Sequence, residues 1–268
     1  MGVRVPSPSI LLLVAALCCC SHGVTLARMG RGRPPPDKRL FVSPLVDRFI
    51  DEMHPRFRDA DLALIWETTL PNALDTTFRV AGPNDTFVIT GDIDAMWLRD
   101  SAFQVAPYLR LLKERENEED PLRGALCGLV MRHARSILID GYANAFNFDA
   151  SSPGPHQHDQ RTPAMTPRVF EGKYELDSLT SFLWLSNELS AIGENDCLKH
   201  DIWMKAIAKV IDIFTTGVAS RSPYRFERSE FDMQALGFGP RGKRGTGLIP
   251  SGFRPSDDPC AFPFHVPR

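Results

Sequence analysis

The sequence lacks the features that mark nucleic-acid-binding and membrane-spanning proteins. Its 31 Lys and Arg residues face 33 Asp and Glu residues, which leaves a formal net charge of −2 over 268 residues. No field of one sign is available to attract nucleic acid, so recognition must depend on a local site. The apolar run at residues 10–20 is shorter than the roughly 18 to 20 residues that span a bilayer. What is present is 43% hydrophobic residues, enough for one sizeable globular core.

Cysteine is also scarce, and its spacing argues against a metal site. Three of the six cysteines lie together at 18–20, which leaves Cys127, Cys197 and Cys260 in the rest of the chain. None of these has a second Cys or His at the spacing of zinc ligands, so no metal is expected. The odd number is compatible with one disulfide and a free thiol, or with a partner cysteine beyond residue 268.

The N-terminus has the pattern of a secretory signal peptide. Arg4 provides a basic start, the apolar run follows, and the small residues Ser21 and Gly23 fit cleavage after Gly23. A membrane anchor is the alternative, but the run is too short for it, so no membrane span is expected after cleavage of residues 1–23. A glycosylation sequon at Asn84 fits the same route. We therefore expect the protein in the lumen of the secretory pathway or outside the cell.

The remaining chain divides into a lead-in and a helical domain. Residues 24–40 are basic and rich in Pro and Gly, which predicts a flexible segment that does not pack. Residues 41–268 are interpreted as the N-terminal part of a single domain. Apolar residues at helical spacing, with Ser43 and Asp120 as N-caps, predict helices over 43–53, 61–70, 98–112, 120–137, 176–193 and 203–217. A small β-hairpin is expected between Thr77 and Thr90, and the fold class is all-α.

The densest group of chemically active side chains lies at 91–101. Asp92, Trp97, Arg99 and Asp100 surround the start of a predicted helix. Carboxylates and a guanidinium group suit the hydroxyls of a sugar, and an indole ring suits its apolar face. The alternative is structural, with an Asp capping the helix and Arg99 and Asp100 forming a local ion pair.

Two further groups repeat this pattern. Glu175 and Asp177 again stand at a helix start, where the structural alternative is stabilisation of the helix dipole. Arg254, Asp257 and Asp258 lie in a Gly/Pro-rich loop, where repulsion between adjacent carboxylates would raise one pKa as a general acid requires. A solvated turn is the alternative for this third group.

The runs 91–101, 174–179 and 247–258, in this order, resemble the signatures of glycoside hydrolase family 125, the exo-α-1,6-mannosidases. The resemblance extends from about Ser43 to the end and includes residues 140–147. It implies an (α/α)6 barrel, no metal or other cofactor, and inverting hydrolysis of a non-reducing terminal mannose on a glycan.

The resemblance also assigns roles to residues. Arg99 and Asp100 would hold the terminal mannose, and Asp92, Trp97, Glu175, Asp177 and Arg254 would line or support the pocket. The general acid would be Asp258 in preference to Asp257. The general base of an inverting glycosidase lies about 6.5 to 9.5 Å from the acid, and in the family it comes from a glutamate beyond residue 268. We therefore expect an incomplete barrel in a truncated chain; the alternative is a non-catalytic, mannose-binding fragment.

Overall fold

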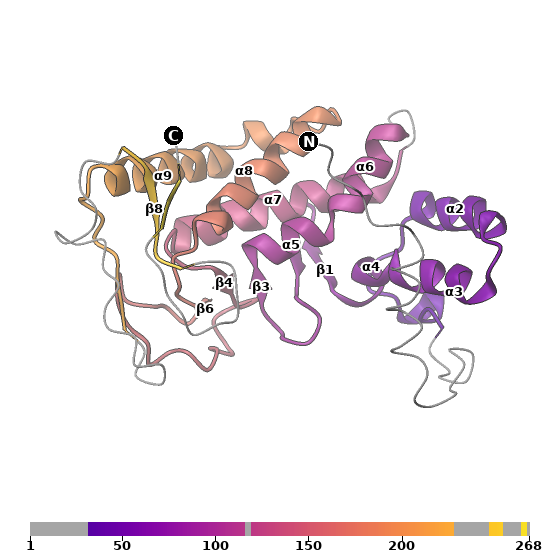
Figure 1. The fold of residues 1–268 in the computed structure, drawn as a ribbon, viewed down its shortest axis with the longest axis horizontal. Coiled ribbons are helices and arrows are strands. Elements are labelled where there is room, and N and C mark those ends of the chain that lie inside the picture. Colours follow the sequence, from indigo (N-terminus) through magenta and orange to yellow (C-terminus); the bar gives the residue numbers. More distant parts are fainter. Residues whose placement is uncertain (1–31, 116–118, 228–246, 254–263, 267–268) are drawn as a thin grey trace, which may run out of the picture.

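The structure is a computed structural model that describes residues 32–115, 119–227, 247–253 and 264–266. Long helices pack side by side in the middle of the molecule, with α2–α4 at one end and small sheets along the other (Figure 1). The helices are α2 (Pro44–Met53), α3 (Ala60–Thr69), α4 (Asn72–Thr76), α5 (Leu98–Gln104), α6 (Ala106–Glu114), α7 (Pro121–Ile139), α8 (Leu176–Ala191) and α9 (Asp201–Val218), with 3-10 turns at Pro36–Lys38, His54–Arg56 and Cys197–Lys199. This helix-rich fold confirms the coarse prediction, while the six-pair barrel remains a prediction.

Two helices begin at the caps that the sequence predicts. Ser43 accepts a hydrogen bond from the Val46 amide at the start of α2, and Asp120 accepts one from the Leu122 amide at the start of α7. The Asp120 carboxylate also accepts from the Ser43 hydroxyl at 2.9 Å and from the Leu45 amide at 2.8 Å. One buried carboxylate therefore serves the first turns of two helices and joins them.

The predicted helix over 98–112 is divided in two. Helix α5 ends at Gln104 and α6 begins at Ala106, with Val105 between them and Pro107 in the first turn of α6. Proline lacks the amide hydrogen that a continuous helix would need there, so the break follows from the sequence. The apolar residues of the predicted face, Leu98, Ala102, Val105, Leu109 and Leu112, are nevertheless all buried.

Within the described residues the strands are short and form four small sheets. The predicted hairpin is present as β1 (Phe78–Gly82) paired with β2 (Asp85–Val88). Three sheets were not predicted: β3 (Met96–Trp97) with β4 (Ala145–Phe146) and β6 (Val169–Glu171), β5 (Gln160–Thr162) with β7 (Arg225–Glu227), and β8 (Ile249–Ser251) with β9 (Phe264–Val266). Strands of two or three residues lack the alternating pattern that reveals longer ones, which explains the omission.

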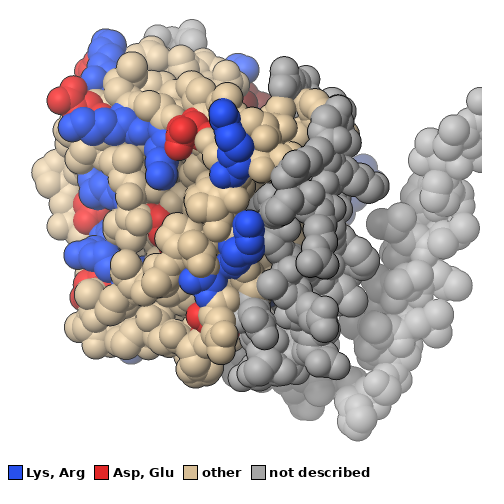
Figure 2. Space-filling model, turned by 90° about the vertical axis from the view of Figure 1, so that its left-hand side faces the viewer, with Lys and Arg blue, Asp and Glu red and all other residues tan. Residues whose placement is uncertain are grey.

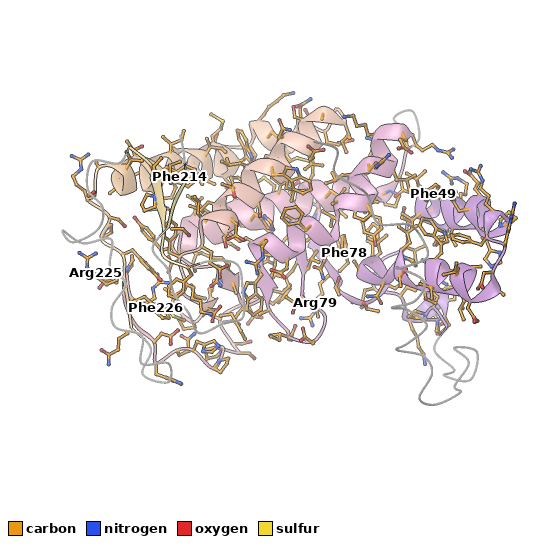
Figure 3. The ribbon with its side chains drawn as sticks, viewed as in Figure 1. Phe49, Phe78, Arg79, Phe214, Arg225 and Phe226 are labelled. Atoms are coloured by element: carbon orange, nitrogen blue, oxygen red, sulfur yellow. A yellow bond between two sulfur atoms is a disulfide. The ribbon has the colours of Figure 1, made fainter. Side chains whose placement is uncertain are left out.

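Helix α7 forms the centre of the core. It packs against α8, α9 and the β1–β2 hairpin, and its predicted stripe, including Leu126 and Ile137, is buried. Phe78 of the hairpin lies near the middle of the molecule, with Phe214 and Phe49 toward its two ends (Figure 3). A disulfide between Cys127 and Cys197 joins α7 to the turn before α9, while Cys260 lies outside the described residues.

The end of the predicted lead-in packs against the domain. The Arg33 guanidinium group is 9% exposed and donates to Asp75 at 2.7 and 3.1 Å, and it also pairs with Asp47. Residues 36–38 form a 3-10 turn directly after it. The flexible segment expected over 24–40 is therefore wrong for its last part, because Asp75 and Asp47 supply ion-pair partners that lie far away in the sequence.

Candidate active site

Four predicted site residues come together where α5 and α8 begin. In the first turn of α5, Arg99 Nη1 lies 3.0 Å from Glu175 Oε2 and 3.0 Å from Asp177 Oδ2. Arg99 Nη2 lies 3.2 Å from Asp100 Oδ2. Because α5 packs against α8, two sequence motifs separated by about 76 residues form one group. We call Arg99, Asp100, Glu175 and Asp177 the Arg99 cluster.

The cluster contains three carboxyl groups and one guanidinium group, so its electrostatics are unbalanced. Glu175 is 3% exposed, and burial raises the pKa of its carboxyl to about 8, with the neighbouring Asp177 adding to the rise and Arg99 opposing it. At neutral pH Glu175 therefore holds a proton and can donate a hydrogen bond. Asp177 Oδ1 is buried and has no hydrogen-bond partner among the described residues. The site thus contains both a donor and an acceptor without a partner among the described residues.

The described part of the third motif lies directly beside Glu175. Glu175 is the N-cap residue of α8, but its own side chain does not cap the helix. Instead, Ser251 Oγ accepts a hydrogen bond from the Leu176 amide at 3.0 Å, and the amides of Gly252 and Phe253 both donate to the Tyr174 carbonyl at 3.0 Å. Ser251 therefore replaces a local cap and frees Glu175 to face Arg99. Arg254, Asp257 and Asp258 lie outside the described residues.

Buried hydrogen bonds hold the segment before α8 in place. The Tyr224 hydroxyl donates to the Gly172 carbonyl at 3.0 Å and accepts from the Tyr174 amide at 3.0 Å. Arg161 donates to the same Gly172 carbonyl at 3.0 Å and pairs with Asp140 at 2.5 Å. Burial raises the pKa of Asp140, while the charge of Arg161 opposes the rise. These contacts make the backbone around Glu175 rigid, which fixes the cluster.

The other two predicted residues of the first motif, Asp92 and Trp97, form no hydrogen bond or ion pair with Arg99 among the described residues. Asp92 is exposed in the turn before β3, where it accepts a hydrogen bond from Thr90 at 3.2 Å. Trp97 is half-buried, and its ring meets Phe170 edge to face at 5.2 Å, with His156 on the same phenyl ring at 5.9 Å. Trp97 precedes α5 and pairs with Ala145 in the sheet, so it lies at the margin of the site.

Sequence reasoning did not assign a role to three neighbouring polar residues. Buried Glu171 accepts a hydrogen bond from Asn144 Nδ2 at 2.9 Å and pairs with Lys173 Nζ at 3.0 Å. The charges of Glu171 and Lys173 both influence the pKa of Glu175. The sequence did contain a signal for these residues: charged side chains occupy the alternating positions 171, 173 and 175, and an extended chain directs every second side chain to the same side.

Within the described residues, no group of three or more His, Cys, Asp or Glu side chains is arranged to hold a metal ion. The same part of the chain contains no helix with the length and apolar character needed to cross a membrane. On the face in Figure 2, Lys and Arg lie interspersed with Asp and Glu among other residues.

Comparison with known proteins decides the family. Residues 59–268 match the sequence profile of the metal-independent alpha-mannosidases, GH125. The chain belongs to glycoside hydrolase family 125. The resemblance inferred from the three motifs is therefore confirmed.

Two relatives of family 125 show how far the similarity extends. The meiotically up-regulated gene 157 protein of Schizosaccharomyces pombe is 35% identical over 258 residues, covering 88% of this chain and 50% of the relative. A solved metal-independent alpha mannosidase from Streptococcus pneumoniae, in a non-productive substrate complex with alpha-1,6-mannobiose, is 34% identical with a TM-score of 0.71, covering 84% of this chain and 53% of that chain. The chain spans about half the length of these relatives.

Proposed function

We propose that this protein is a glycoside hydrolase that removes terminal α-1,6-linked mannose from glycans with inversion, and that the Arg99 cluster binds this mannose. Family membership supports the chemistry, and the alpha-1,6-mannobiose in the streptococcal relative supports the linkage. The observation that carries the assignment of the site is Asp177, whose Oδ1 is buried without a hydrogen-bond partner among the described residues.

A buried acceptor without a partner costs roughly 1 to 3 kcal/mol. A sugar hydroxyl that donates to Asp177 Oδ1 would recover this free energy on binding. Arg99 holds the opposite oxygen, Oδ2, at 3.0 Å and so keeps Oδ1 in a fixed direction. The protonated Glu175 beside it supplies a donor for a second oxygen of the sugar. Such a paired donor and acceptor selects the orientation of neighbouring hydroxyls.

For the chemical step we propose Asp258, or else Asp257, as the general acid, with the general base contributed from beyond residue 268. Both candidate acids follow Phe253 by four or five residues, and Phe253 forms a β-bridge with Glu175. This short connection favours a position near the bound mannose. Inversion requires the acid to protonate the glycosidic oxygen while the base activates water on the opposite face of the sugar.

The test is release of mannose from α-1,6-mannobiose by the 268-residue chain and by a protein extended through the downstream reading frame. We expect activity only in the extended protein, with β-mannose as the first product detected by NMR. Asp258→Asn should abolish hydrolysis but preserve binding, and Asp177→Asn should weaken binding. Asp196→Asn is the matched control, because Asp196 is exposed and pairs only with Lys199 in the recorded ion pairs.

Other outcomes would change the proposal. Hydrolysis by the 268-residue chain would refute a base from beyond residue 268, and α-mannose as the first product would refute inversion. Mannose binding without hydrolysis in the extended protein would select the non-catalytic alternative. Unchanged binding of mannose by Asp177→Asn would refute the assignment of the Arg99 cluster as the mannose-binding site.

A further inference from the structure

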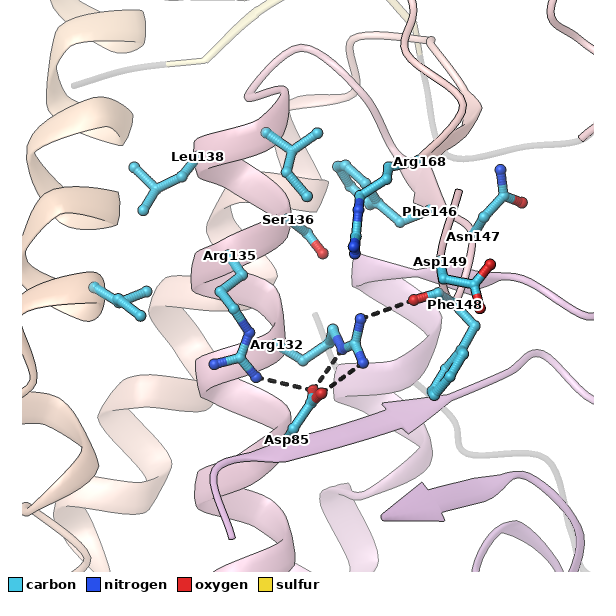
Figure 4. Close-up of a pocket in the computed structure, with 12 residues that line it drawn as sticks. Asp85, Arg132, Arg135, Ser136, Leu138, Phe146, Asn147, Phe148, Asp149 and Arg168 are labelled. Atoms are coloured by element: carbon cyan, nitrogen blue, oxygen red, sulfur yellow. Dashed lines mark hydrogen bonds and ion pairs between the residues drawn. The ribbon is translucent and has the colours of Figure 1, made fainter. Parts of the chain in front are cut away.

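A cavity lies beside the C-terminal half of α7, apart from the Arg99 cluster. Its volume is about 630 Å³, which is within the usual range for small-molecule sites. Its walls include Asp85, Arg132, Arg135, Phe148 and Arg168 (Figure 4). We call this cavity the α7 pocket.

Asp85 orients two of the three arginines of the α7 pocket. Arg132 donates to both carboxylate oxygens of Asp85, at 2.6 and 2.7 Å, and to the Phe148 carbonyl at 3.0 Å. Its guanidinium group also lies over the rings of Phe87 and Phe148, at 5.3 and 5.1 Å from their centroids. Arg135 donates to the same carboxylate at 2.8 Å. These contacts explain how the hairpin is fastened to α7, but they use only one negative charge for two positive ones.

Arg168 adds a third positive charge without a carboxylate partner. Within the described residues the Arg168 side chain forms no hydrogen bond and no ion pair. Its guanidinium group points toward Arg132 and Ser136 in Figure 4. The pKa of Arg132 is lowered, first by burial and also by the charges of Arg135 and Arg168, although Asp85 opposes this. Arg135 and Arg168 are therefore each close enough to Arg132 to repel its charge.

The second carboxylate of the α7 pocket cancels only part of this excess. Asp149 lies at the rim, where its oxygen accepts hydrogen bonds from the amide and hydroxyl of Ser151. Those hydrogen bonds lower the pKa of Asp149, and the charges of Arg168 and Arg132 lower it as well. In Figure 4 the Asp149 carboxylate points away from Arg132. The lining of the pocket thus holds three guanidinium groups and two carboxylates, an excess of one positive charge.

We propose that the α7 pocket binds a phosphorylated sugar, with its phosphate monoester between Arg168 and Arg135. Guanidinium groups bind phosphate through charge-assisted hydrogen bonds, and the bound phosphate would relieve their mutual repulsion. The volume is much larger than one phosphate ion requires, and the remaining walls combine the ring of Phe148 with the polar side chains of Asn147 and Ser136. This combination suits a sugar ring.

This inference is independent of the proposed hydrolysis, because it concerns different residues. Strand β4 joins the two sites: Ala145 pairs with Trp97 on the side of the Arg99 cluster, and Phe146 lines the α7 pocket. Binding is measured without turnover, so failure of the mannosidase assay would leave the result interpretable.

The experiment is calorimetric titration of the 268-residue chain with mannose 6-phosphate, mannose and inorganic phosphate at low salt. We expect mannose 6-phosphate to bind more tightly than either of the other two. Arg168→Gln should weaken its binding by about tenfold or more, as expected for loss of a charge-assisted contact, and Arg168→Lys should retain part of it. Arg110→Gln is the control, because Arg110 is an exposed arginine paired with Glu114 on α6.

Arg168 is exposed and has no ion-pair partner within the described part of the chain, so its replacement should leave the melting temperature unchanged, which is checked for each variant. Equal binding by Arg168→Gln and Arg110→Gln would overturn the proposal, as would absence of binding to the unmutated chain. Equal affinity for mannose would exclude recognition of the anion, and equal affinity for inorganic phosphate would exclude recognition of the sugar.

Discussion

Replacement of Arg99 by glutamine should destabilise the protein through loss of charge at the cluster. Arg99 lies 3.0 to 3.2 Å from three carboxyl groups, and one of these, Glu175, is almost completely buried. Because Glu175 is protonated at neutral pH, the ionic partners of Arg99 are Asp177 and Asp100, whose side chains are 26% and 37% exposed. Loss of hydrogen bonds between charged groups costs roughly 1 to 3 kcal/mol, and partial exposure reduces it, so we expect about 2 kcal/mol. For a domain of this size that corresponds to a fall in melting temperature of about 4 to 8 °C.

The assay is urea unfolding at pH 7.5, arranged as a double-mutant cycle with Asp177→Asn. Asp177→Asn removes a partner when Arg99 is present but removes an unpaired charge when Arg99 is absent. The double variant should therefore be more stable than the sum of the single losses predicts, by about 1 to 3 kcal/mol. Arg110→Gln, at an exposed ion pair, should change stability by less than about 0.5 kcal/mol. Additive losses, or equal losses in Arg99→Gln and Arg110→Gln, would refute the reasoning.

Three further predictions concern other contacts. Because burial raises the pKa of Glu175 to about 8 in the folded state, its contribution to stability is complete below about pH 4.5 and is lost as the pH rises through 8. Glu175→Gln should therefore reduce the loss of stability between pH 6 and pH 9, measured by urea unfolding. An unchanged pH dependence in this variant would contradict the prediction. The disulfide between Cys127 and Cys197 closes a loop with a sequence separation of 70, so replacing both by serine should cost about 4 kcal/mol, measured by denaturant unfolding without reductant. Gly128→Ala should lower the free energy of unfolding by about 1 to 3 kcal/mol, because the new methyl group would lie 2.6 Å from Thr86 Oγ1 and 3.1 Å from backbone nitrogens of the hairpin. A melting temperature equal to that of the unmutated protein would show that the hairpin adjusts.

The sequence predicted those parts of the fold that depend on neighbouring residues. Helix α2 begins after Ser43 and α7 begins after Asp120, because each cap bonds to amides two or three residues away. The hairpin at 78–88 was predicted from its turn and its apolar strands. The division between α5 and α6 was missed, although Pro107 carried the signal. Here the continuous apolar face outweighed a single helix-breaking residue in the interpretation.

The site was predicted less completely, because its composition depends on contacts across the chain. The motifs identified Arg99, Glu175 and Asp177, and the structure brings these three together. Glu171 was not assigned to the site, and its partner Asn144 comes from 27 residues earlier in the sequence. The packing of Arg33 against Asp75 was also unforeseen, for the same reason.

By itself, then, the sequence determined most of the long helices, the caps at Ser43 and Asp120 and the family, since each depends on local spacing or on a short motif. Only the tertiary structure decided that α5 packs against α8 and so gives Arg99 its carboxylates. It also decided that Ser251 caps α8, 75 positions away from Leu176, which leaves Glu175 buried and protonated. The physical reason is that burial and the distance between charges set the pKa of a carboxyl group, and both are properties of the folded chain.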